Sequence, residues 1–387
     1  MPLAHVDSLR GKGTDVIKKV LIVDNSPCAG RLLGKALERE PTLEVVGQAL
    51  DAYEAREMIK ALDPDVLTLD VAMPGMDGLT FLRNLMRLHP MPVVMVSSPT
   101  SDGAGITLDA LVAGAVDFCV KRQPVDEEDL RDYMGDIAAR VRNAAHARAA
   151  HDGAGATAAA RSVSSLPESQ LARRRFRAGT SPAPGIVRLL AVGASTGGPE
   201  ALREMVSGLD ADGCAMVLSQ HMPERFMVSF AERLNANSPL EIHVAEDDEE
   251  IVAGRGYVAP GNRHLTVRRR DGRLFCRLDG RGPVCGHRPS VDVMFASVAE
   301  QVGRGALGIL MTGMGEDGAA GLLEMHGRGA LTIVQDEDSS VVWGMPGRAA
   351  SIGAADVQLA LEHIGPFANW LLSRGRRAAS RLAAFRV

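Results

Sequence analysis

Short apolar runs alternate with amphipathic stretches through the first part of the chain. The segments between these runs, such as 52–62 and 79–88, carry apolar residues at helical spacing. Near-continuous apolar runs separated by helices are typical of strands buried on both faces of a parallel sheet. The runs are Val20–Val23, Leu43–Gly47, Val66–Leu69, Val93–Val96 and Val116–Val120. The pattern predicts a doubly wound, flavodoxin-like α/β domain over residues 18–145.

The same alternation begins again after a break and predicts a second domain. Residues 146–184 are small, polar and basic, so they bury too little apolar surface to offset the entropy of ordering, and we expect a flexible linker. Beyond them, apolar runs recur at Val187–Val192, Ala215–Ser219, Gly256–Val258, Ala306–Met311 and Leu331–Gln335. We expect a second doubly wound parallel sheet, Rossmann-like, over residues 185–375, followed by a basic tail.

Composition narrows the class of protein. A chain of 387 residues with 46% hydrophobic content is long enough for two packed cores. The net charge of −5 gives no reason to expect binding to nucleic acid. The five cysteines are scattered and odd in number, which favours buried thiols in a reducing compartment. No apolar run approaches the roughly 20 residues of a membrane span, and no signal-peptide core is recognisable, so we expect a cytoplasmic protein.

Four polar residues follow successive apolar runs in the first domain. They are Asp24, Asp70, Ser97 and Lys121. In an open parallel sheet the carboxyl ends of the strands form one crevice, so these side chains are expected to meet there. Carboxylates hold Mg²⁺, and Asp70 can attack a phosphoryl group as a nucleophile. One aspartate after a strand is usually a turn residue, but four such positions favour a phosphorylation site, with Ser97 and Lys121 sensing the phosphate.

These residues make the first domain resemble the receiver domain of bacterial response regulators over its whole length. The resemblance implies that Asp70 is the phosphoacceptor and that Mg²⁺ is held by Asp24, Asn25 and Asp70. Receivers usually carry a second acid at the position of Asn25, and a proline directly after Lys121. A neutral amide removes a charge from a site for a hard cation. We therefore expect weakened Mg²⁺ binding and slow phosphorylation.

A serine lies between glycines where an apolar run turns toward a helix. Residues Gly193 to Gly197 match the G-x-S-x-G pattern, in which the turn exposes the hydroxyl of Ser195. Pro199 and Glu200 are favourable first-turn residues of a helix. The motif alone also fits a phosphate-binding loop or a plain tight turn.

A histidine and an aspartate in matching positions favour a hydrolase. His221 follows the run 215–219, and Asp317 lies in a glycine-rich loop after another apolar run. A hydroxyl, an imidazole and a carboxylate at strand ends are the components of a serine hydrolase. His264 is a competing base, less favoured because it follows a glycine-rich segment. The chain order Ser, His, Asp differs from that of α/β-hydrolases.

The second half of the chain resembles the chemotaxis protein-glutamate methylesterase family. The resemblance rests on the segments GASTGGPEAL, SQHMP, YVAPGNRHL, MTGMGEDGAAGL and QDEDSSVVWGMPG, and on the order of the two domains. It implies hydrolysis of glutamyl γ-methyl esters on methyl-accepting chemotaxis receptors, with deamidation of receptor glutamines at the same site. By its matching motifs the resemblance implies that Ser195 is the nucleophile, His221 the general base and Asp317 its orienting acid. It also implies that Thr196 and Met314 line the active site or help to form the oxyanion hole.

The resemblance also implies partners and control. A chemotaxis histidine kinase is the expected phosphodonor, the receptors are membrane proteins that the enzyme meets from the cytoplasm, and no organic cofactor is expected. In the family the unphosphorylated receiver covers the esterase cleft. An alternative is a non-enzymatic two-component signalling protein whose C-terminal domain is a degenerate nucleotide-binding domain, although this chain lacks the spacing and lysine of a P-loop. A serine hydrolase of small esters is a further alternative.

Overall fold

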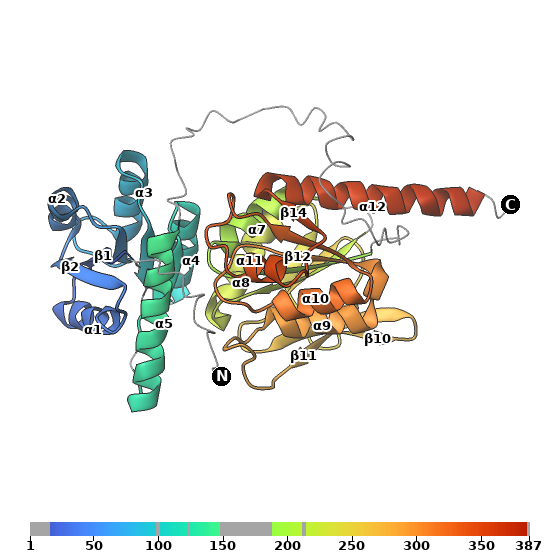
Figure 1. The fold of residues 1–387 in the computed structure, drawn as a ribbon, viewed down its shortest axis with the longest axis horizontal. Helices are drawn as coiled ribbons and strands as arrows, with labels where there is room; N and C mark the ends of the chain where they lie inside the picture. The colour runs from blue at the N-terminus through green and yellow to red at the C-terminus, as the bar shows by residue number, and fades with distance from the viewer. Residues whose placement is uncertain (1–15, 98–100, 123, 148–187, 211–213, 385–387) are drawn as a thin grey trace, which may run out of the picture.

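The structure is a computed structural model that describes residues 16–97, 101–122, 124–147, 188–210 and 214–384, with side chains of 101–104 and 373–384 left out. The predicted linker and its arginines therefore lie outside the described residues. Within these ranges no helix has the length and apolarity to cross a bilayer. Figure 1 shows two α/β domains, the N-terminal one in blue and green and the C-terminal one in yellow to red.

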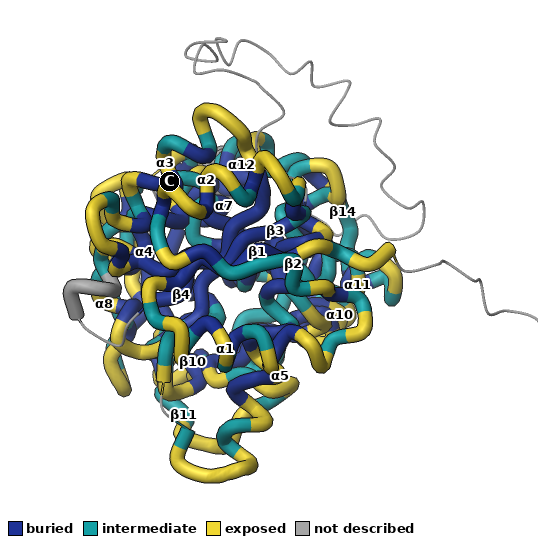
Figure 2. Tube along the Cα trace, turned by 90° about the vertical axis from the view of Figure 1, so that its left-hand side faces the viewer, coloured by how far each residue is buried: buried dark blue, intermediate teal, exposed yellow. Residues whose placement is uncertain are grey.

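The N-terminal domain is a five-stranded parallel sheet with strand order β2-β1-β3-β4-β5. Its strands are β1 (Lys18–Val23), β2 (Leu43–Ala49), β3 (Val66–Asp70), β4 (Val93–Ser97) and β5 (Asp117–Val120). Its helices are α1 (Pro27–Leu37), α2 (Ala52–Leu62), α3 (Gly78–Leu88), α4 (Ser101–Val112) and α5 (Glu127–His146). The predicted doubly wound sheet is confirmed. Strands β1, β3 and β4 are buried, and the edge strand β2 is partly exposed (Figure 2).

Side-chain caps fix where the N-terminal helices begin. Ser26 accepts from the amide of Ala29 at the start of α1, and Asp126 accepts from that of Asp129 at the start of α5. Each cap satisfies a backbone N–H that has no partner inside the helix. The caps set the helix starts just beyond the strand ends, which leaves the carboxyl edge of the sheet open for polar side chains.

The C-terminal domain is a seven-stranded parallel sheet with strand order β14-β13-β12-β6-β7-β9-β8. Its strands are β6 (Leu189–Ala194), β7 (Ala215–Gln220), β8 (Glu241–Val244), β9 (Arg255–Val258), β12 (Ala306–Leu310), β13 (Leu331–Gln335) and β14 (Val357–Leu359). Its helices are α7 (Gly198–Ser207), α8 (Glu224–Ala236), α9 (Val291–Gln301), α10 (Ala319–Gly327), α11 (Met345–Ser351) and α12 (Leu361–Ala384).

Some elements of this domain were not predicted from the apolar pattern. An antiparallel hairpin of β10 (His264–Arg270) and β11 (Arg273–Asp279) packs beside the main sheet. Strand β10 ends in three arginines, so it has no continuous apolar run. Helix α12 is also longer than expected, because the residues assigned to a tail continue the same helix to Ala384.

The two domains pack directly against each other. Helices α4 and α5 lie at the end of the N-terminal domain nearest the C-terminal domain (Figure 1), and α4 contacts α7 and α8. The rings of Phe118 in β5 and Phe226 in α8 are in contact, with centroids 4.7 Å apart and planes tilted by 53°. Arg233 of α8 forms an ion pair with Asp109 of α4 at 2.5 Å. The carboxyl edge of the C-terminal sheet is therefore approached by the N-terminal domain.

Candidate active site

The structure brings Ser195, His221 and Asp317 to the carboxyl ends of neighbouring strands. Ser195 directly follows β6 and His221 directly follows β7, which pairs with β6. Asp317 lies in the loop after β12, the other neighbour of β6. The backbone keeps the first two ends in register, since the His221 amide donates to the Ala194 carbonyl at 3.2 Å.

His221 and Asp317 form a buried pair. Nε2 of His221 lies 2.7 Å from Oδ2 of Asp317, with side chains 5% and 1% exposed. Three further donors reach Asp317: the Ser290 hydroxyl at 2.7 Å, the Val291 amide at 2.7 Å and the Asp292 amide at 3.1 Å. Burial by itself raises the pKa of Asp317, but the hydrogen bond and charge of His221 and the bonds from 290 and 291 outweigh it and hold that pKa below its usual value. The carboxyl is thus an anion beside the imidazole.

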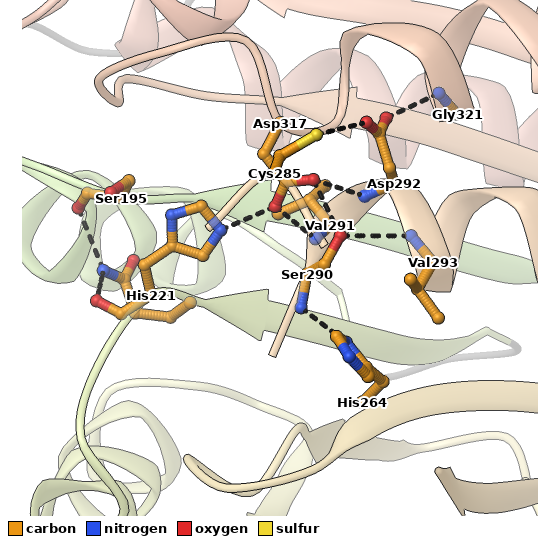
Figure 3. A network of polar contacts seen from close by, with 11 residues as sticks. Ser195, His221, His264, Cys285, Ser290, Val291, Asp292, Val293, Asp317 and Gly321 are labelled. Carbon is orange, nitrogen blue, oxygen red and sulfur yellow. Dashed lines mark hydrogen bonds and ion pairs between the residues drawn. The ribbon is translucent and has the colours of Figure 1, made fainter. Parts of the chain in front are cut away.

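The other ring nitrogen of His221 is available to a nucleophile. Nδ1 is buried and has no hydrogen-bond partner among the described residues. Figure 3 shows Ser195 and Asp317 on opposite sides of the His221 ring. Because Asp317 is an acceptor, Nε2 carries the proton of the neutral ring and Nδ1 carries the lone pair. That lone pair is the group a general base needs.

Glycines allow the turn that carries Ser195. Gly197 has φ of 74°, and a Cβ there would lie 2.6 Å from Cβ of Val341. A Cβ on Gly313 would lie 2.8 Å from that of Ser195. The turn is further held by Gln220, whose Nε2 donates to the Ser195 carbonyl at 2.9 Å. Helix α7 begins at Gly198, whose amide donates to the Ser195 carbonyl at 2.8 Å and closes the turn.

Thr196 and Met314, expected beside the oxyanion, both contact the N-terminal domain. The Thr196 hydroxyl donates to Oδ2 of Asp117 at 2.8 Å. Nδ2 of Asn143 on α5 donates to the sulfur of Met314. Asp117 is itself paired with Arg140 of α5 at 3.0 Å. Strand β5 and helix α5 therefore contact both residues that we expected beside the oxyanion. We call the edge of the site formed by Thr196 and Met314 the rim.

The competing histidine has a different environment. His264 is fully buried, its Nδ1 accepts from the Ser290 amide at 3.0 Å, and its Nε2 lies 3.1 Å from the Gly282 carbonyl. Both ring nitrogens are thus engaged, and neither faces Ser195. His264 supports the segment that holds Asp317, because Ser290 bonds to both residues.

Two contributors to the site were missed at the level of sequence. His287 stacks on His221 with ring centroids 3.8 Å apart and ring planes 10° apart. Ser290 caps α9 and also bonds to Asp317. A serine directly before an apolar helical pattern is a recognisable cap, so the sequence did carry a signal for Ser290. His287 lies in an irregular loop, and no pattern in the sequence connects it to His221.

The predicted phosphorylation site also converges. Nζ of Lys121 lies 2.8 Å from Oδ2 of Asp24 and 2.8 Å from Oδ2 of Asp70. Asp24, Asp70 and Ser97 are almost fully buried, whereas Asn25 is exposed. Burial, together with the charge of Asp24, raises the pKa of Asp70 despite the bond from Lys121. Burial lowers the pKa of Lys121, but the two carboxylates raise it above its usual value.

The donor set at this edge fits a hard divalent cation. The Oδ1 atoms of Asp24 and Asp70 accept from the amides of Ser26 and Ala72, at 2.8 and 3.2 Å, which fixes both carboxylates. Their Oδ2 atoms converge on one point, now taken by the Lys121 ammonium. Paired carboxylate oxygens are ligands that Mg²⁺ prefers. Asn25, at the exposed rim, contributes at most a neutral amide oxygen.

Comparison with known proteins gives a consistent result for both domains. Residues 20–134 match the family model of the response regulator receiver domain, and residues 190–367 match that of the CheB methylesterase. A protein-glutamate methylesterase/protein-glutamine glutaminase 1 of Hahella chejuensis is 48% identical over 355 residues, which cover 91% of this chain and 96% of the relative. One of the same name from Xanthomonas campestris pv. campestris is 47% identical over 353 residues, 89% and 95% of the two chains. The crystal structure of the Thermotoga maritima CheB methylesterase catalytic domain is 34% identical, covers 48% of this chain and 98% of that one, and has a TM-score of 0.46.

Proposed function

This chain belongs to the protein-glutamate methylesterase/protein-glutamine glutaminase family, and from that premise we propose its substrate, its mechanism and its control. The substrate is the γ-methyl ester of glutamate side chains on methyl-accepting chemotaxis receptors, and the products are the free carboxylate and methanol. The same site hydrolyses the side-chain amide of selected receptor glutamines to glutamate and ammonia.

Ser195 is the nucleophile in this mechanism. Its hydroxyl oxygen attacks the ester carbonyl carbon, and Nδ1 of His221 takes the hydroxyl proton. The tetrahedral intermediate collapses when His221 returns that proton to the leaving methoxide, which departs as methanol and leaves an acyl-serine. Water, deprotonated by the same ring, then attacks the acyl carbon and regenerates Ser195. Asp317 stabilises the imidazolium and fixes the ring through Nε2.

The negative oxygen of the intermediate needs donors that are already in place. We place these donors in the turn that joins Ser195 to the start of α7 at Gly198. Thr196 and the loop at Met314 complete this rim. In the present arrangement the Thr196 hydroxyl donates its hydrogen bond to Asp117 instead, at 2.8 Å. The N-terminal domain thus withholds a donor and covers the rim.

The N-terminal domain, over residues 18–145, regulates the esterase domain, over residues 185–375, through the linker at 146–184. Phosphoryl transfer from a chemotaxis histidine kinase to Asp70 adds charge beside Asp24. Ser97 and Lys121 reorient toward the phosphate, and the interface at β5 and α5 loosens. Asp24 and Asp70 would hold Mg²⁺, with a weak contribution from Asn25, and the ion would supply charge that neutralises phosphoryl oxygens. The reaction takes place in the cytoplasm, at the surface of membrane-embedded receptors and without nucleic acid or an organic cofactor.

One observation carries this proposal: the buried 2.7 Å pair of His221 and Asp317, with Nδ1 of the ring left for a proton acceptor role. Its test is methanol release from methylated receptor membranes, with and without acetyl phosphate. Ser195→Ala should lower turnover at least about a thousandfold. Ser207→Ala, an exposed serine at the end of α7, is the matched control and should leave it unchanged.

The rival interpretations give different results in the same assay. A non-enzymatic signalling protein would release no methanol and would not be labelled at Ser195 by a fluorophosphonate. A hydrolase of small esters would be labelled and would cleave p-nitrophenyl acetate but not methylated receptor. Turnover of receptor that survives Ser195→Ala would move the nucleophile to another residue.

A further inference from the structure

A second histidine covers one face of the His221 ring. His287 and His221 lie parallel, with centroids 3.8 Å and planes 10° apart. The loop that carries His287 is held by a reciprocal pair of backbone bonds, in which Val284 donates to the His287 carbonyl at 3.0 Å and His287 donates to the Val284 carbonyl at 2.9 Å. These bonds fix the backbone from which the second ring projects.

We propose that His287 is a positioning residue for the esterase reaction, because its flat ring holds the plane of His221 so that Nδ1 stays aimed at Ser195. The inference rests on the triad proposed above. His287 forms no bond with the reacting atoms in this role; it acts through the ring that it covers.

The steric argument starts from the hydrogen bonds of His221. The bond from Nε2 to Asp317 fixes one edge of the ring, but a single bond still permits the ring to tilt about the line from Cβ to Nε2. An imidazole edge reaches about 2 Å from that line, and stacked rings touch at about 3.5 Å. With a parallel ring 3.8 Å away, a large tilt drives an edge of His221 into His287. The stack therefore limits the movement that would carry Nδ1 away from the serine.

The charge state of His287 is also compatible with its position over His221. Burial, followed by the proximity of His221, lowers the pKa of His287 to about 4. Arg140 of α5 acts in the same direction, while Asp317 and Asp136 of α5 oppose it. His287 is thus neutral at neutral pH, and an uncharged ring lies over His221 when that ring takes up the serine proton. A second cation in this place would oppose the proton transfer.

The test compares three replacements of His287 in the full chain, assayed with acetyl phosphate on methylated receptor. His287→Ala removes the covering ring and should lower kcat about 10- to 100-fold, with KM unchanged, since small displacements of a catalytic group cost up to about a hundredfold. His287→Phe restores a flat, neutral ring and should recover kcat to within about threefold of wild type. His287→Leu fills a similar volume but has no flat ring, so its kcat should be as low as that of the alanine variant.

A second readout does not depend on receptor binding. The rate at which a fluorophosphonate labels Ser195 should follow the same order: wild type and the phenylalanine variant fast, the leucine and alanine variants slow. Thermal unfolding of each variant identifies misfolding, and the phenylalanine and leucine pair decides the matter even where alanine does not fold. Equal kcat in these two variants, a rise in activity, or a change in KM alone would overturn the positioning role. If the wild-type protein releases no methanol, the proposed function itself is wrong. If the wild-type protein is active but the variants do not follow the expected order, only the positioning role is wrong.

Discussion

The hydroxyl of Thr196, next to the proposed nucleophile, donates to the carboxylate of Asp117 in the receiver domain at 2.8 Å. Asp117 is 5% exposed, and its other oxygen accepts from Arg140 at 3.0 Å. A residue of strand β5 therefore reaches directly into the rim of the esterase site. The covered state is held by a specific bond as well as by contact area.

Loss of that bond should release part of the inhibition. Asp117→Ala leaves Thr196 without its acceptor, and hydrogen bonds to charged groups contribute about 1.5–3 kcal/mol. We expect methanol release without a phosphodonor to rise about tenfold, limited by the remaining contacts of the interface. Asp136→Ala, which removes the other acidic partner of Arg140 but does not touch Thr196, is the control. Equal rates for both variants, in folded protein, would contradict the role of the bond.

The orienting acid is tested by a change that keeps its shape. Asp317→Asn preserves the size of the side chain but removes the charge that stabilises the His221 imidazolium. Loss of this charge should lower kcat about 10³- to 10⁴-fold. Asp292→Asn is the matched control, because its side chain accepts from the Gly321 amide at 2.7 Å and not from His221. Comparable losses in the two variants would indicate a general disturbance of the α9 start.

Asp70, the proposed phosphoacceptor, should lower the stability of the folded protein at neutral pH. Burial and Asp24 raise the pKa of Asp70 in the folded protein above the usual 3.8. Below that usual value the carboxyl is protonated in both states and carries no penalty; as the pH rises through the folded pKa, ionisation increasingly costs folding free energy. Asp70→Asn should therefore raise Tm at pH 7 but not at pH 3, by about 4 °C for each 1 kcal/mol relieved. A gap that is equal at both pH values would contradict the raised pKa.

The amide at the metal edge should limit phosphorylation. Asn25→Asp adds an acid beside Asp24 and Asp70, and each added charge strengthens a hard-cation site. We expect the Mg²⁺ concentration for half-maximal labelling of Asp70 by acetyl phosphate to fall about tenfold. Asn84→Asp, on the outer helix α3, is a control for added charge alone. Unchanged Mg²⁺ dependence in the Asn25 variant would show that the amide serves the metal as well as an acid does.

The convergence of several site residues is predictable from sequence, because parallel strands place their carboxyl ends at one edge of the sheet. Ser195 and His221 each follow an apolar run, and parallel strands bring their carboxyl ends to one edge, so their convergence needs no further information. The same logic gathers Asp24, Asp70 and Lys121. The two parallel sheets, one in each domain, are predicted by the alternation of apolar runs with helical segments.

Other parts depend on tertiary contacts that leave no local pattern. The bond from Thr196 to Asp117 joins two domains, and nothing near either residue specifies the docking. His287 lies in a loop whose course is set by the reciprocal bonds with Val284. Strand β10 was missed because a run of arginines interrupts its apolar character. Burial of one face against α9, not β propensity, is what retains it in the fold.

The aromatic contact between the two domains should shorten the lifetime of the separated conformation that we propose to be active. Phe118 and Phe226 are 5% and 0% exposed while the domains are docked. Separation would hydrate both rings, and each large apolar side chain costs about 1.5–3 kcal/mol to transfer to water. In the proposed cycle, this surface drives reassociation once the phosphoryl group is hydrolysed, so the signal ends spontaneously and only its onset requires a phosphodonor.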